Sequence, residues 1–92
     1  MNGKELVATK MMEIEQLYAK VEKEIRAYLK FSKTDAYMEC LAVNMKLMGL
    51  AIIVARLGDD DKDNTKFYEK TIGDLIHVQD SLADLVSELD KS

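Results

Sequence analysis

Residues 34–58 read TDAYMECLAVNMKLMGLAIIVARLG, and this stretch decides the fold. Its apolar residues recur at alternating spacings of three and four along two separate rows. The first, which we call the methionine row, contains Met38, Leu41, Met45, Met48, Ile52 and Ala55. The second, which we call the cysteine row, contains Cys40, Val43, Leu47, Leu50, Val54 and Leu57. A helix with two apolar rows must be covered on two faces, so we expect this segment at the centre of a helical fold.

The composition of the chain is that of one all-α domain spanning residues 1–92. Hydrophobic residues make up 48% and charged residues 33%, which is typical of a globular protein. The chain has no Pro and four Gly. Because Pro is the residue that most strongly ends helices, its absence favours long uninterrupted helices.

Apolar periodicity predicts one helix on each side of the central segment. Over residues 3–31 the spacing alternates between four and three along Val7, Met11, Ile14, Tyr18, Val21, Ile25 and Tyr28. Over residues 65–89 the same alternation runs through Thr71, Leu75, Val78, Leu82, Leu85 and Leu89. We therefore expect two amphipathic helices, each with one apolar row to bury.

Capping residues indicate where these helices begin and end. Asn2 followed by Glu5 is typical of a helix start, and Ser32 or Thr34 would begin the central helix. Gly58 stands where a left-handed residue would end that helix, and Asp63 or Asn64 would cap the third. No Gly or Pro separates the first two helices, so a single bent rod is the alternative reading of that junction.

We predict an up-down-up three-helix bundle with helices at about residues 3–31, 35–57 and 65–89. Two flanking helices can cover both rows of the central one, but Leu6, Leu17 and Leu29 are then left over. The small residues Ala42 and Gly49 would also let another helix approach the central one closely. We therefore expect a homodimer, the commonest symmetric assembly.

The charge distribution bears on partners. The net charge is -4, and residues 59–92 hold four Lys against ten Asp and Glu, which argues against nucleic acid as a general partner. The first helix has a basic side formed by Lys20, Lys23, Arg26, Lys30 and Lys33. This side could contact the acidic face of the third helix, and nucleic-acid binding through it is a second alternative function.

The single cysteine, Cys40, lies on an apolar row and cannot form an intramolecular disulfide. A buried, reduced thiol fits the cytoplasm. The charged N-terminal residues show no export signal, and the uncharged apolar run at residues 47–55 is shorter than the roughly 20 residues of a membrane span. We predict a cytoplasmic protein with no membrane partner.

Two acidic patterns suggest metal chemistry. Asp59, Asp61 and Asp63 alternate like the start of a calcium-binding loop, but Asn64 replaces the required Gly and Lys70 the closing Glu. We therefore expect no metal and no cofactor there. A weak candidate polar site lies along the third helix, and an enzyme or metal site built on it is the first alternative function: Asp74, His77, Asp80 and Asp84.

Since no catalytic pattern is complete and apolar helical surface is in excess, we expect a non-enzymatic protein that binds another protein. It would be a regulatory adaptor, a chaperone-like factor or an inhibitory factor of the kind carried by bacteria or phages. The predicted partner or dimer surface consists of Met38, Met45, Met48, Gly49, Leu50 and Ile53.

Overall fold

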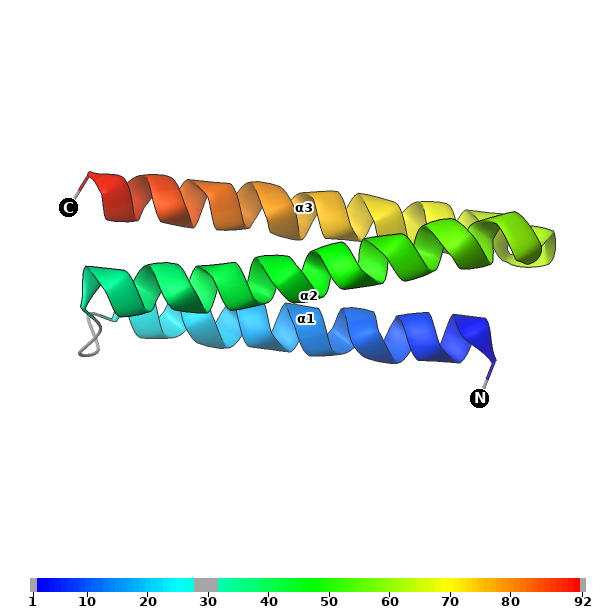
Figure 1. Ribbon diagram of the computed structural model, residues 1–92, viewed down its shortest axis with the longest axis horizontal. Coiled ribbons are helices and arrows are strands. Elements are labelled where there is room, and N and C mark those ends of the chain that lie inside the picture. Colours follow the sequence, from blue (N-terminus) through cyan, green and yellow to red (C-terminus); the bar gives the residue numbers. More distant parts are fainter. Residues whose placement is uncertain (1, 28–31, 92) are drawn as a thin grey trace.

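A computed structural model describes residues 2–27 and 32–91, and within them the chain is an all-α three-helix bundle without strands (Figure 1). The elements are α1 (Gly3–Arg26), α2 (Lys33–Asp60), a 3-10 turn η1 (Lys62–Asn64) and α3 (Thr65–Asp90). The helices run up, down and up, which leaves the two chain ends at opposite ends of the bundle (Figure 1). The bundle measures 46 × 22 × 16 Å. The predicted fold class is confirmed.

The starts of α1 and α2 follow the predicted capping chemistry. The Asn2 Oδ1 accepts a hydrogen bond from the Glu5 backbone N–H at 2.8 Å, and the Ser32 Oγ accepts one from the Asp35 N–H at 3.1 Å. These bonds satisfy donors that a helix start leaves unpaired. Since α1 ends at Arg26 and α2 begins afresh at Lys33, the two are separate helices and the bent rod is wrong.

The predicted end of the first helix, at about residue 31, is too late, because α1 ends at Arg26 with Ala27 as its cap. The N–H of Ala27 donates to the carbonyl of Lys23 at 2.9 Å. Residues 28–31 lie outside the described part of the chain, and with them the predicted contributions of Tyr28, Leu29 and Lys30.

The end of α2 also differs from the prediction. Gly58 is not a left-handed terminator, because α2 continues through it to Asp60. The helix ends where the Asp61 N–H donates to the Leu57 carbonyl at 2.8 Å. The Asp61 carboxylate in turn accepts from the Asn64 amide at 2.8 Å and from the Tyr68 hydroxyl at 2.9 Å. Side-chain bonds at Asp61 therefore hold the turn that a glycine was expected to make.

The start of α3 confirms one predicted cap position and corrects its chemistry. Asn64 is the cap residue, but its side chain makes no capping bond because its amide faces Asp61. Instead, the Thr65 hydroxyl donates to the carbonyl of Lys62 at 2.8 Å. Asp63, the other predicted cap, lies inside η1.

The core forms along the predicted rows. From α2 the cysteine row is buried, apart from the half-buried Leu57, and α1 contributes Val7, Met11, Ile14 and Val21. From α3 the row from Thr71 to Leu85 is buried, and Leu89 packs against it. Tyr68, only 3% exposed, extends this row by one step toward the helix start. Leu17 also packs against the core, so one of the surplus apolar residues is used within the chain.

Candidate interaction surface

The methionine row of α2 faces outward. Its large side chains have these exposed fractions: Met38 59%, Leu41 48%, Met45 65%, Met48 54% and Ile52 56%. The reason is the geometry of α2, whose cysteine row points into the core between α1 and α3 and so turns the methionine row away from both. Only one of the two predicted apolar faces is therefore covered by the described part of the chain.

The rest of this outward face is small or cationic. Ala42, Gly49 and Ala55 are exposed between the large side chains, and Lys46 and Arg56 are the exposed charged residues of residues 38–56. A Cβ added at Gly49 would meet nothing within 4 Å. A contiguous exposed apolar face of this kind is typical of a site that binds another molecule.

The apolar surface extends from α2 toward α3. A groove of about 460 Å³ lies between these helices and is lined by residues that include Tyr37 and Leu41 of α2 and Gln79 of α3. Ile76 is 51% exposed and stands three residues before Gln79, so it lies on the same side of α3 as the groove. The outward apolar surface is thus wider than a single row.

The predicted surface residues divide between outside and inside. Met38, Met45, Met48 and Gly49 are exposed, whereas Ile53 is half-buried beside α1. Leu50 is corrected: it is 2% exposed and lies in the core, because it belongs to the cysteine row. Sequence reasoning left Leu41 and Ile52 out of the surface, although their place in the methionine row was the signal that could have included them.

The predicted polar site on α3 is a solvent-exposed face. His77, Asp80 and Asp84 are exposed, and Asp74 is partly buried. The Asp74 carboxylate accepts a hydrogen bond from the Lys70 ammonium at 2.9 Å. Within residues 2–27 and 32–91, no group of three or more His, Cys, Asp or Glu side chains could hold a metal ion. The geometry therefore offers no assembled polar centre on this face.

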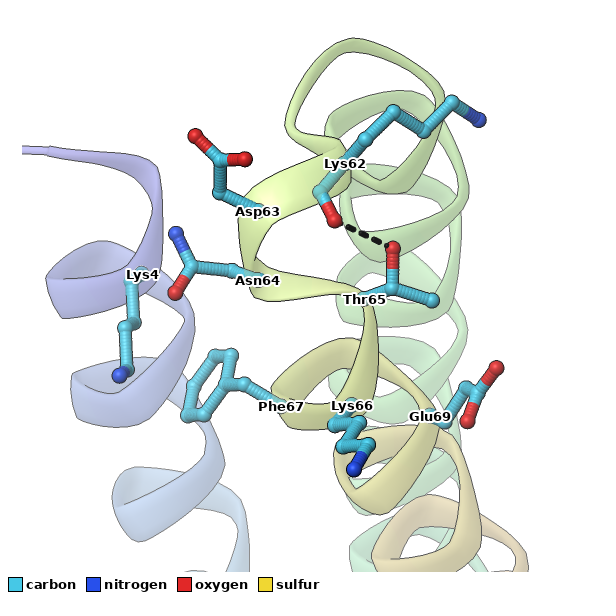
Figure 2. Close-up of a pocket in the computed structure, with 8 residues that line it drawn as sticks. All are labelled: Lys4, Lys62, Asp63, Asn64, Thr65, Lys66, Phe67 and Glu69. Atoms are coloured by element: carbon cyan, nitrogen blue, oxygen red, sulfur yellow. Dashed lines mark hydrogen bonds between the residues drawn. The ribbon is translucent and has the colours of Figure 1, made fainter.

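The acidic run after residue 58 is divided between the end of α2 and the turn that follows it. Asp59 and Asp60 belong to α2, and the Asp61 carboxylate is occupied by Asn64 and Tyr68. A depression of about 570 Å³ lies at this end of the bundle (Figure 2). Figure 2 shows its charged side chains, among them Lys62, Asp63 and Glu69, pointing away from one another. Its lining combines lysine, aspartate and glutamate side chains with the aromatic ring of Phe67.

Lys4 of α1 approaches the ring of Phe67. The Lys4 Nζ lies 5.2 Å from the centroid of the Phe67 ring, and Phe67 packs edge-on against Tyr68. A cation over an aromatic face is a stabilising contact between helices. These contacts join α1 to the start of α3. Lys4 and Phe67 therefore have a structural role in holding the two helices together.

Arg26, on the basic side of α1, contacts the acidic face of α3, as expected. The Arg26 Nη1 lies 2.7 Å from the Glu88 Oε2, across 62 residues of sequence. Lys20 and Lys23 of the same side are exposed. Arg26 therefore has a structural role, because it pairs with Glu88 inside the same chain.

Among the described residues, α2 is long and apolar enough to cross a membrane by length and composition. The expectation of no membrane span rested on the uncharged run at residues 47–55, whereas α2 contains a longer apolar stretch of 18 residues. The core helix of a soluble protein can contain such a stretch equally well. In the bundle, 28% of that stretch is buried, and the large side chains of the methionine row are exposed on the same helix.

Comparisons of this chain with protein-family models, curated proteins and solved structures give no match. The surface of the bundle itself therefore has to support any functional conclusion.

Proposed function

We propose that this chain acts by binding protein through the methionine row of α2. Adaptors, chaperone-like factors and inhibitory factors all work through such a contact, and the chain belongs with them as a non-enzymatic, regulatory protein. The observation that carries the proposal is the row itself, with five large apolar side chains each about half exposed or more.

The energetic reason is the hydrophobic effect. Fully burying a Leu, Ile or Met side chain is worth about 1.5–3 kcal/mol, so a side chain left half exposed forgoes on the order of 1 kcal/mol. The methionine row repeats that loss along one face, while α3 keeps a polar outer face at His77, Asp80 and Asp84. A partner that covers the row recovers this free energy on binding.

The residue types on this face favour a helical protein partner over a lipid surface. Methionine side chains adapt their shape to a partner, and Ala42 and Gly49 leave space for a second helix backbone. Helices that lie in a membrane interface usually carry Trp or Phe among their apolar residues and many cations opposite. Along α2 there is no Trp or Phe, and the exposed cations beside the row are Lys46 and Arg56.

Photo-crosslinking in the source cells tests the proposal. A photoreactive amino acid replaces Met45, which is 65% exposed in the middle of the row, and in a matched variant it replaces the exposed His77 of α3. We expect discrete protein adducts from position 45 that are absent from position 77. Mass spectrometry of the adducts identifies what covers the row.

The outcomes separate cleanly. A protein adduct specific to position 45 supports the proposal, whether the captured protein is a second copy of this chain or a different one. Lipid adducts alone, or the same adducts from both positions, would overturn it.

A further inference from the structure

We propose that the methionine row is covered by a second copy of this chain, with the two α2 helices packed antiparallel about a two-fold axis. This inference rests on the proposed function and names its partner. Three independent features of α2 agree on it: the spacing of the row, the charges beside it and the small residues on one flank.

The spacing of the row is self-complementary in the antiparallel sense. In the heptad repeat of this row, Met38, Met45 and Ile52 occupy the first position, and Leu41, Met48 and Ala55 occupy the fourth. In an antiparallel helix pair, each first-position residue faces a fourth-position residue of the other helix. Met45 then faces Met48 of the second copy, Leu41 faces Ile52, and Met38 faces Ala55. The next pair outward is Thr34 with Asp59, both exposed and polar. The row is therefore apolar over the length that the pairing uses, about 25 Å at 1.5 Å per residue.

The charges beside the row select the antiparallel orientation. In this register Asp35 of each copy lies beside Arg56 of the other, so the symmetry creates two opposite-charge pairs at the ends of the interface. Both residues are exposed, and within the described residues Arg56 makes no ion pair. A parallel pair would instead place Arg56 beside Ala51, which offers no charge.

The small residues lie on the same flank as these charges. Between the two Asp35 and Arg56 pairs, Ala42 of one copy faces Gly49 of the other, again twice by symmetry. Both are exposed, and the space around the Gly49 Cα is open. Small residues at this position let two helix backbones approach closely. The opposite-charge pairs of Asp35 and Arg56 thus lie at the two ends of the interface. The pairs of Ala42 and Gly49 lie between these ends, where they allow the two helices to pack closely.

Mass in solution tests the pairing. Light scattering and sedimentation over a range of concentrations should give about twice 10.5 kDa for the natural chain. Met45→Glu places a carboxylate opposite Met48 in both symmetric Met45–Met48 pairs at the centre of the interface. It should raise the dissociation constant of the dimer by at least about 100-fold. Its matched control is Met12→Glu on α1, since Met12 is 58% exposed and lies outside the row. The control should keep the mass of the natural chain.

Circular dichroism of the same variants checks that they remain folded. Because Met45 is exposed, the Met45→Glu chain should keep its helical content as a monomer. Ile52→Lys, at a second exposed position of the row, should give the same result.

Disulfide trapping tests the orientation. In a Cys40→Ser background, a mixture of Leu41→Cys and Ile52→Cys chains should form the mixed disulfide on mild oxidation. Leu41→Cys alone should not crosslink to itself, because two copies of residue 41 would lie about 16 Å apart along the antiparallel pair, beyond the reach of a disulfide.

The results decide this inference separately from the proposed function. A concentration-independent monomer, a dimer that survives Met45→Glu, or ready self-crosslinking of Leu41→Cys would overturn the antiparallel pair. Capture of a different protein at position 45 would then leave the proposed function standing. Lipid-only adducts together with a monomeric chain would remove both.

Discussion

Arg26 of α1 and Glu88 of α3 form an ion pair across the bundle, with the Arg26 Nη1 2.7 Å from the Glu88 Oε2. The Arg26 Nε also lies 3.4 Å from the Glu22 carboxylate, to which the Tyr18 hydroxyl donates at 3.0 Å. A chain of polar contacts therefore runs along α1 and crosses to α3. It joins the two helices that are most distant in sequence.

Arg26→Gln should lower the melting temperature slightly at low ionic strength and leave it unchanged in about 1 M salt. Both side chains are about half exposed, so solvent and salt screen the pair. Thermal melts at both salt concentrations measure the effect. Lys20→Gln removes an exposed cation of α1 that makes none of the ion pairs among the described residues, and it should show no such salt dependence.

The alkaline limit of stability should depend on Tyr18. Burial, followed by the hydrogen bond to Glu22, raises the pKa of Tyr18 from 10.0 to about 12. Because the unfolded chain gives up this proton first, the stabilisation is fully present below about pH 10 and is lost as the pH rises toward about 12. Urea unfolding of the natural chain and of Tyr18→Phe from pH 8 to 12 should show a shallower decline for the variant. Parallel curves would contradict this role of Tyr18.

Leu50→Ala should destabilise the folded chain by about 2–5 kcal/mol, the usual cost of truncating a fully buried leucine. Leu50 is 2% exposed, in the core between the helices. Ile76→Ala is the control, since Ile76 is 51% exposed and its truncation should change the free energy of unfolding by no more than about 0.5 kcal/mol. Equal effects in urea unfolding would show that Leu50 is not a core residue.

Gly58→Ala should stabilise the chain by about 0.5–1 kcal/mol. α2 is helical through Gly58, an added Cβ meets nothing within 4 Å, and alanine is the better helix former. Gly3→Ala is the contrasting change, because its Cβ would lie 3.1 Å from a Leu57 methyl carbon and should bring no such gain. A loss of stability in Gly58→Ala would instead indicate the left-handed helix end that the sequence suggested.

Helix ends were predicted well where a local side chain decides them. Asn2 and Ser32 each cap within three residues, so their sequence context is sufficient. The end of α2 was mispredicted because Asp61 is held by Tyr68, seven residues away in the next helix. The buried Tyr68 hydroxyl needs a partner, and that requirement becomes visible only when α2 and α3 are packed together.

The sequence by itself determined that the chain forms three helices and which positions on α1 and α3 face the core, because apolar periodicity is a local property of each helix. It also identified the two rows of α2, but it placed Leu50 on the same predicted surface as Met45, since both rows have the same spacing and nearly the same apolarity. Only the tertiary structure decided that Leu50 belongs inside with the cysteine row. The physical reason is that α1 and α3 can enclose α2 from one side only, and packing rather than periodicity selects the row that they cover.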